Sequence, residues 1–255
     1  IVLQALLRLA RKTLKSATLW VIAAISFSSI FFFSIPFPLI IGLAAIFGFV
    51  KIMNYKKSNA TPTIPKSRDI FKTTLIWASI WWIPIIFIDL IADAPLMAEI
   101  GYFFSKLAIV SFGGAYAVLT YMAQDVIGQF GWLTPAEMMD GLGLAETTPG
   151  PLILVTEFVG FLTGFKTTGL LHGVFGAIVA LWATFIPCFL WIFAGGPYID
   201  WLTNQPRLQG ALGAIMAAVV GGIANLFVWF GINLFFTETT YIDIGAANFL
   251  IPDFK

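Results

Sequence analysis

The residues best suited to chemistry lie in a proline-rich stretch, ETTPGP at 146–151, inside an otherwise apolar region. Two prolines that flank a glycine interrupt a helix, because proline lacks a backbone N–H and its ring clashes with the preceding turn. The apolar run at 151–165 has 15 residues before Lys166, whereas a membrane span needs about 20. This pattern predicts a discontinuous helix whose second half begins near Pro151, since proline suits the first helical turn.

A helix that begins inside a membrane has a chemistry of its own. Its first backbone N–H groups have no partner within the helix, and its N-terminus carries a partial positive charge. Such ends bind anions, and discontinuous helices mark substrate sites in secondary transporters. The stretch at 146–151 is therefore predicted to hold an anion.

A second unusual stretch, KLAIVSFGGAYAVLTY at 106–121, carries a lysine and tandem glycines. Gly113 and Gly114 favour either irregular backbone or close packing of helices, and both interpretations stay open. Lys106 either pairs with a partner or substrate, because a buried ammonium group is costly in a membrane, or extends its side chain to the interface.

Two acids accompany the predicted break. Glu146 lies beside the prolines, and Glu157 follows in the second half of the helix. Broken backbone at membrane depth is tolerated where it lines a cavity, which favours a functional role for Glu146. Glu157 is either a proton site or a residue that faces water.

The chain offers little to an enzyme. It contains one histidine, His172, and one cysteine, Cys188, which excludes a disulfide framework or a thiolate metal site. No nucleophile–base pair, metal motif or cofactor motif is recognisable in the sequence, so no cofactor is expected. We expect His172 at an interface and Cys188 in the core.

The composition is that of a membrane protein. Of the 255 residues, 59% are hydrophobic and 11% charged, and the mean hydropathy is +0.93, whereas soluble chains carry roughly 25% charged residues. Apolar runs such as 18–50 and 169–194 are continuous, which is typical of helices and not of barrel strands. The predicted fold class is all-α, a polytopic transmembrane helix bundle with short and discontinuous helices.

The basic residues predict the topology. Ten of the 14 Lys and Arg lie in residues 1–72, in clusters before residue 18 and between 51 and 72. The positive-inside rule places both clusters in the cytoplasm, and the same rule explains these residues without a nucleic-acid partner. The 33 residues at 18–50 must then form a hairpin, with its turn at Ile35-Pro36-Phe37-Pro38.

Residues 51–70 form a polar linker with Pro62 and Pro65 and are taken as the main boundary. The predicted organisation is a basic lead-in and hairpin at 1–50, a cytoplasmic linker at 51–70, and a membrane domain at 71–255. Further spans are expected at 71–90, 102–123, 144–165, 169–194 and 208–236, followed by a weakly patterned tail.

Several motifs in this chain resemble those of the chromate ion transporter family. They are SFGGAYAVL (111–119), DGLGLAETTPGPL (140–152), VGFLTG (159–164), FIPCFL (185–190), GPYID (196–200) and AVVGGIANL (218–226). They occur in order with consistent spacing, and the resemblance covers about 101–235. It implies a multi-pass inner-membrane transporter that exports chromate, confers chromate resistance and is driven by protons or by a counter-anion.

The resemblance also implies an inverted-repeat architecture with two homologous halves. The motifs resemble the second half, and residues 18–50 with IPFPLI resemble the hairpin that closes the first. The chain is accordingly expected to lack most of the first half and to be truncated at its C-terminal end. A missing half or a homo-oligomer, together with membrane lipid, would be its partner.

In this interpretation a tetrahedral dianion, chromate or sulfate, binds at the N-terminus of the second half-helix. The predicted binding residues are Lys106, Ser111, Gly113, Gly114, Thr147, Thr148, Gly150 and Pro151. Glu146 and Glu157 are the candidates for proton coupling, because a carboxylate beside a dianion binds a proton more readily. The alternatives are a transporter of sulfate or another oxyanion, and a scaffold or partner half that does not itself transport.

Overall fold

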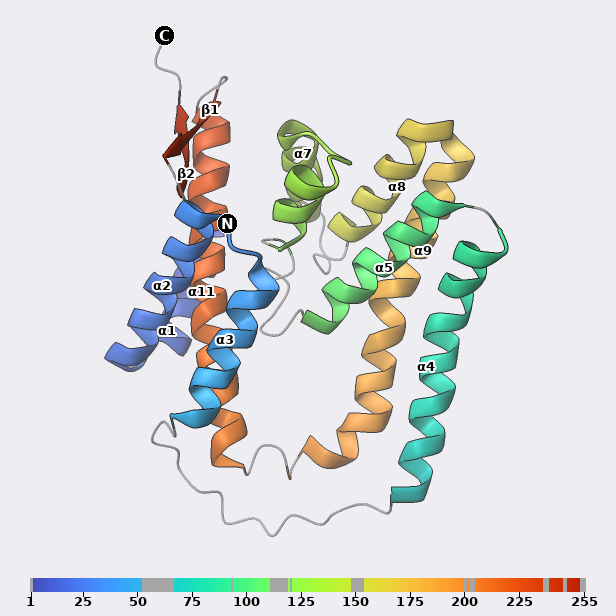
Figure 1. The fold of residues 1–255 in the computed structure, drawn as a ribbon, viewed down its shortest axis with the longest axis horizontal. Coiled ribbons are helices and arrows are strands. Elements are labelled where there is room, and N and C mark those ends of the chain that lie inside the picture. The colour runs from blue at the N-terminus through green and yellow to red at the C-terminus, as the bar shows by residue number, and fades with distance from the viewer. Residues whose placement is uncertain are drawn as a thin grey trace. The chain divides into compact units, whose positions relative to one another are not determined.

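The computed structural model shows two compact units, each assembled from segments that are distant in the sequence (Figure 1). Unit 1 comprises residues 1–57, 112–130 and 205–255, and unit 2 comprises residues 58–111 and 131–204. The structure describes residues 2–51, 67–92, 94–110, 119, 121–147, 154–199, 201, 205–235, 239–244 and 247–252.

Unit 1 is built on one long helix, α11 (Pro206–Phe235), against which a helical hairpin packs. The hairpin consists of α2 (Ala17–Phe33) and α3 (Phe37–Val50). Ser34 ends α2 in the left-handed region with φ 49°, and Pro36 immediately precedes α3. The break that the sequence predicts around the prolines of residues 35–38 is therefore present.

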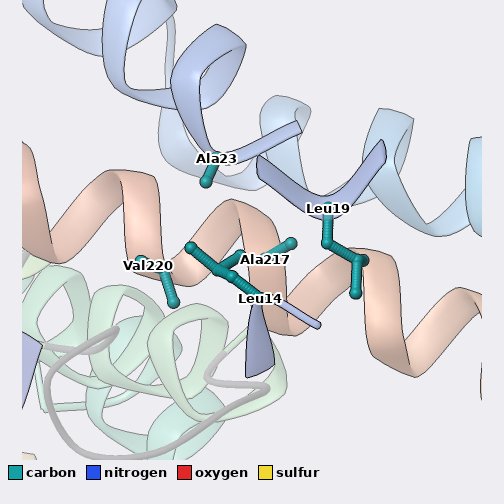
Figure 2. Close-up of a cluster of buried hydrophobic side chains, with 5 residues drawn as sticks. All are labelled: Leu14, Leu19, Ala23, Ala217 and Val220. Carbon is teal, nitrogen blue, oxygen red and sulfur yellow. The ribbon is translucent and has the colours of Figure 1, made fainter. Parts of the chain in front are cut away.

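The amphipathic helix α1 (Val2–Thr13) also packs on α11. Its apolar residues rest against a cluster of buried side chains from α2, α11 and the link between α1 and α2. Burial of small and branched side chains joins the N-terminal hairpin to α11, although residues 51–205 separate them in the sequence (Figure 2). The cluster consists of Leu14, Leu19, Ala23, Ala217 and Val220.

Glycines set how closely α3 approaches α11. Gly48 and Gly210 lie so close that a Cβ atom added to either would overlap the carbonyl oxygen of the other. Small residues at such a crossing allow van der Waals contact between backbones, which is a common basis of helix association in membranes. The contact places the C-terminal end of α3 beside the first turn of α11, where Arg207 lies over the ring of Phe49.

The described residues of unit 2 form two long helices and three short ones, apart from short continuations of one of them. The long helices are α4 (Ser67–Leu90) and α9 (Leu170–Leu190), and α9 is continued by the π-helical η2 (Trp191–Gly195) and the 3₁₀-helical η3 (Gly196–Tyr198). The short helices are α5 (Pro95–Val110), α7 (Pro135–Thr147) and α8 (Leu154–Thr168).

Three of the described helices are long and apolar enough to cross a membrane: Ile70–Leu90, Leu170–Tyr198 and Pro206–Ile232. Many of their large apolar side chains are exposed, as expected where lipid is the solvent. The helical membrane fold predicted from the sequence is confirmed, including its short and discontinuous helices.

Two details differ from the sequence-based expectation. The span expected at 102–123 begins earlier, because α5 starts at Pro95, and α5 ends at Val110. The weakly patterned tail contains an antiparallel hairpin of β1 (Thr239–Ile244) and β2 (Ala247–Pro252), with Thr239 opposite Pro252.

Candidate functional site

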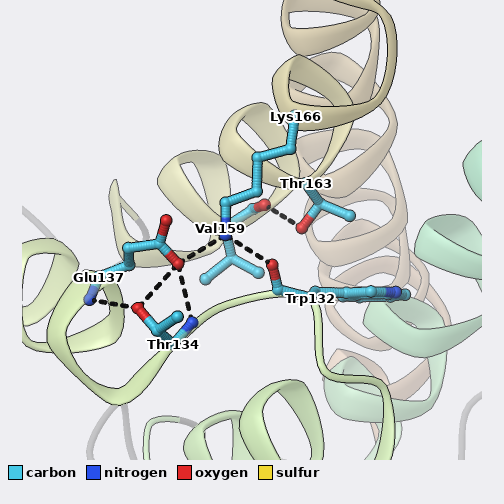
Figure 3. A network of polar contacts seen from close by, with 6 residues as sticks. All are labelled: Trp132, Thr134, Glu137, Val159, Thr163 and Lys166. Atoms are coloured by element: carbon cyan, nitrogen blue, oxygen red, sulfur yellow. Dashed lines mark hydrogen bonds and ion pairs between the residues drawn. The ribbon is translucent and has the colours of Figure 1, made fainter.

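The predicted helix break is present in unit 2, but its two halves fold back on each other. Helix α7 ends at Thr147 and α8 begins at Leu154. Lys166, in the last turn of α8, forms an ion pair of 2.5 Å with Glu137, in the first turn of α7 (Figure 3). The beginning of one helix therefore lies beside the end of the other, and the pair is antiparallel.

Glu137 joins this contact to the start of α7. Its Oε2 accepts hydrogen bonds from the Thr134 backbone N–H at 2.8 Å and from the Thr134 hydroxyl at 3.0 Å. The Glu137 N–H donates to Thr134 Oγ1 at 3.3 Å, which completes a capping box. Lys166 also donates to the Trp132 carbonyl at 3.1 Å. The same carboxylate thus caps α7 and holds the end of α8.

The electrostatics agree with this role. The Lys166 ammonium group, followed by the Thr134 backbone N–H, lowers the pKa of Glu137 below its ordinary value. Lys166 is also suitably placed at a helix C-terminus, where the partial negative charge of the last carbonyls favours a cation. Glu137 lies outside the three apolar spans and is partly exposed.

Neither half is long enough to cross a bilayer. Helices α7 and α8 have 13 and 15 residues, or about 20 and 22 Å at 1.5 Å per residue, against a hydrocarbon core of ~30 Å. With both open ends together, the pair has the geometry of a re-entrant hairpin. The sequence-based picture of one helix interrupted midway is correct about the break and wrong about the direction of the second half, which reverses.

Glycines bring α8 into close contact with α9. Gly160 contacts Gly176, and Gly164 contacts the His172 carbonyl, so closely that a Cβ atom would overlap backbone in each case. Continued at the same spacing, this antiparallel register would place Leu154, the first residue of α8, level with Trp182 of α9. Trp182 lies near the middle of the candidate span Leu170–Tyr198, so the register predicts that α8 begins within the depth of that span.

Helix α5 also ends in this region of unit 2. It packs against α9 and α8, and the indole N–H of Trp81 donates to the buried Ser105 hydroxyl at 2.9 Å, which fixes α5 on α4. Lys106 follows directly and is exposed on α5. Glu157 is half-buried in the first turn of α8. Two of the predicted site residues therefore lie near the ends of α5 and α8 that adjoin the breaks.

The other predicted site residues are only partly described. Glu146 and Thr147 form the last turn of α7, and their side chains lie outside the description. His172 is exposed at the start of α9. Ser111, Gly113, Gly114, Thr148, Gly150 and Pro151 lie outside the described residues.

The expectation that Cys188 belongs to the core is wrong. Cys188 is exposed on α9, where its thiol donates to the Thr184 carbonyl at 3.4 Å. A small apolar side chain needs no core when lipid surrounds the helix. Within the described part of the chain, no group of three or more His, Cys, Asp or Glu residues could hold a metal ion.

Sequence reasoning missed a second polar site, in unit 1. Asp125 is buried, and it lines a cavity of about 470 Å³ between η1 (Gln124–Gln129), the α2–α3 turn and α11. The available signal was a Gln-Asp pair directly after an apolar run. Such a pair is common in exposed polar segments, and its burial here depends on contacts with residues about 90 positions earlier.

Comparisons with known proteins agree with the motif resemblance. Residues 98–252 match a family model described as chromate transporter. A chromate transport protein of Cupriavidus metallidurans is 30% identical over 155 residues, which cover 61% of this chain and 35% of that protein. A probable chromate transport protein of Synechococcus elongatus is 31% identical over 140 residues, covering 55% of this chain and 34% of that protein.

A shorter relative, the uncharacterized transporter YwrB of Bacillus subtilis, is 29% identical over 120 residues, which cover 46% of this chain and 57% of that protein. The chain thus spans about a third of the length of the first two relatives and just over half of the third. No solved structure matches the chain at a significant level.

Proposed function

The chain belongs to the chromate transporter family, and we propose that it is part of a secondary transporter that exports chromate across the inner membrane. The observation that carries this proposal is the α7–α8 hairpin. A half-helix that starts inside the membrane presents backbone N–H donors and a partial positive charge to an anion, whereas the lipid tails provide neither.

We place the anion at the N-terminal side of α8. The backbone around Gly150 and Pro151 and the hydroxyls of Thr147 and Thr148 would supply donors to a tetrahedral dianion. Ser111, Gly113 and Gly114, which follow the end of α5, would form the facing wall, and Lys106 would add positive charge. Chromate and sulfate have the same shape and charge, so sulfate is the competing substrate.

Coupling is assigned to the acids at the same helix ends. A proton on Glu146 or Glu157 would remove a negative charge close to the dianion and favour its binding. Release of the proton would favour release of the anion. In a proton antiporter, export of chromate would then be coupled to inward movement of protons. Exchange for a counter-anion would not require protonation of either acid.

The test uses the full-length gene product in inverted membrane vesicles, with chromate uptake as the measurement. Lys106→Ala and Glu146→Gln are expected to reduce the initial rate at least tenfold, which corresponds to about 1.4 kcal/mol. Lys12→Ala and Glu99→Gln, at exposed positions elsewhere, serve as matched controls. Wild-type rates in both site variants would remove this site assignment.

A second candidate is a partner half that supports transport by another chain. A non-transporting half would gain no stability from the anion, whereas a binding half gains roughly 2.7 kcal/mol at 100 times the Kd. Thermal unfolding of the purified chain with and without sulfate separates the two candidates.

A further inference from the structure

The N-terminal helix α1 presents more apolar surface than its packing in unit 1 uses. Leu6, Leu9 and Ala10 form a packed face against the buried cluster. Leu3 and Leu7, one turn apart, lie beside this packed face and are 46% and 48% exposed. Apolar side chains this exposed on a membrane protein are suited to contact with lipid. The helix therefore has a second apolar face, which adjoins the first.

The remaining side of α1 is basic. Arg8, Arg11 and Lys12 are exposed, and their spacing of three and four residues places them on one side of the helix. Lys15, exposed in the link to α2, follows at the next such position, and these four residues are called the basic face. At 3.6 residues per turn, the two exposed leucines lie between the basic face and the packed face. Positive charge and apolar surface are thus presented side by side.

The charge of this part of the chain has a single sign. Asp69 is the first acidic residue in the sequence, so the charged side chains from α1 to the end of α3 are all basic. The long helix α11, on which α1 packs, contains Arg207 and no acidic residue. The surface around α1 is therefore complementary to a negatively charged partner.

Packing on α11 places the basic face at one end of unit 1. The α2–α3 turn lies beside residues 225–229 of α11, and Ala23 of α2 lies against Gly221. Helix α2 therefore begins on the side of α11 that lies toward its first residues. Helix α3 ends on the same side, because Gly48 contacts Gly210. The link from α1 and the end of α3 thus adjoin the N-terminal part of α11.

The residues at this end of unit 1 are of the kinds found at a membrane surface. The Lys51 ammonium group lies 5.5 Å from the centroid of the Phe47 ring, and the Arg207 guanidinium group lies 5.8 Å from that of Phe49. Trp20, in the first turn of α2, is 58% exposed. Tryptophan is enriched where hydrocarbon meets the headgroups, and lysine and arginine near helix ends extend to the same layer. This end of unit 1 therefore has the composition of a membrane interface.

The combination of faces indicates which negatively charged partner fits. A small anion dissolved in water would use the basic face alone and would leave the exposed leucines without a role. A nucleic acid would do the same, because its phosphate backbone binds lysine and arginine. The surface of an anionic bilayer meets both faces at once, since its phosphate groups attract the basic side chains and its acyl chains accept the leucines.

We propose that α1 lies at the membrane surface, where its basic face binds the headgroups of anionic phospholipids and Leu3 and Leu7 insert among the acyl chains. The cytoplasmic leaflet is the expected side, because it carries the anionic lipids and attracts basic segments. This contact would anchor the start of α2 and so hold the α2–α3 hairpin at a fixed depth. The proposal does not depend on the proposed transport function.

The test measures which phospholipid gathers beside α1 in the full-length protein, in nanodiscs of phosphatidylglycerol and phosphatidylcholine. In a Cys188→Ser background, Gln4→Cys, at an exposed position on the basic side, carries a donor fluorophore. A trace of one lipid or the other carries the acceptor. The density of phosphatidylglycerol obtained from energy transfer is expected to exceed that of phosphatidylcholine roughly threefold or more. The same donor at Leu90→Cys, beside Asp89 at the end of α4, should show no such preference.

Two sets of variants separate the charge from the apolar contact. The triple variant Arg8→Gln/Arg11→Gln/Lys12→Gln removes charge but keeps good helix formers, and it should abolish the preference. The variant Arg8→Lys/Arg11→Lys keeps the charge and should retain it. Leu3→Gln/Leu7→Gln should lower energy transfer to both lipids, because the helix then lies farther from the acyl chains.

Four results would overturn the proposal. They are equal densities of the two lipids beside wild-type α1, a preference that persists in the triple glutamine variant, and unchanged transfer in the double leucine variant. The fourth is energy transfer to neither lipid, which would mean that a protein partner covers α1. Inorganic phosphate added at constant ionic strength should leave the preference unchanged. Its loss on this addition would also overturn the proposal, in favour of a site for a small anion.

Discussion

The described part of the chain contains two helical hairpins broken by proline, and their described hydrogen bonds lie at opposite ends. In the α2–α3 hairpin of unit 1, the described hydrogen bonds are at the turn, where Gln124 pairs with three backbone groups. In the α7–α8 hairpin of unit 2, they are at the open ends, where Glu137 and Lys166 meet. Both hairpins thus contain a proline break, but their described hydrogen bonds are at the turn in one and at the open ends in the other.

The difference suggests a division of labour. A turn whose backbone is already paired with a protein side chain presents few groups to a ligand. In the α7–α8 hairpin, the proposed anion would pair with the first backbone N–H groups of the second helix. In unit 1 a buried acid, Asp125, lines the cavity beside the turn.

The largest expected effect concerns the contact that sets the depth of α8. Gly160→Ala should lower stability by roughly 1–3 kcal/mol, because the added methyl group overlaps the backbone of Gly176 and forces the helices apart. Gly143→Ala in α7 is the matched control, since a methyl group there meets open space. Thermal unfolding in lipid micelles measures both, and equal stability of the two variants would contradict the α8–α9 register.

The second prediction tests whether the turn of the α2–α3 hairpin depends on one side chain. Gln124→Met keeps the shape of the side chain but removes the partners of the Ser34 and Ile35 carbonyls. The free energy of unfolding should fall by about 0.5–1.5 kcal/mol, the net contribution of hydrogen bonds to partly exposed backbone groups. Gln129→Met, at an exposed position of the same segment, should have little effect. If Gln124→Met is as stable as wild type, water replaces the side chain and the contrast between the hairpins weakens.

The smallest effect is expected at the open ends of the α7–α8 hairpin. Lys166→Met should cost at most about 1 kcal/mol, because both partners are partly exposed and salt screens them. The folded-state pKa of Glu137 is lowered, so its contribution is present at neutral pH and is lost as the pH falls through that lowered value. Urea unfolding in lipid micelles at neutral and acidic pH should show the difference between wild type and variant disappearing on acidification. A difference that grows as the pH falls would contradict the ion pair.

Much of the fold followed from local sequence signals. The breaks near Pro36 and Pro149 were predictable because proline acts on its own turn. The long spans were predictable because bilayer thickness fixes their length: residues 71–90 and 208–236 were expected, against Ser67–Leu90 and Pro206–Phe235 in the structure.

The remaining features depend on contacts between distant residues. Lys166 finds its partner 29 residues earlier, so the reversal of α8 has no local signature. Asp125 resembles any acid in a polar segment until the α2–α3 turn, 89 residues away, is packed beside it. Cys188 was misplaced for a related reason, because burial in a bilayer protein does not follow apolarity.

The side of the membrane on which α7 begins and α8 ends tests the re-entrant hairpin most directly. In a full-length Cys188→Ser background, single cysteines at Ala136 and Thr168 can be challenged with a membrane-impermeant thiol reagent from either face. Both open ends lie together, so both cysteines should react from the same face and neither from the opposite one. Reaction from opposite faces would mean that the segment crosses the membrane as one interrupted helix, and the proposed anion site would have to be abandoned.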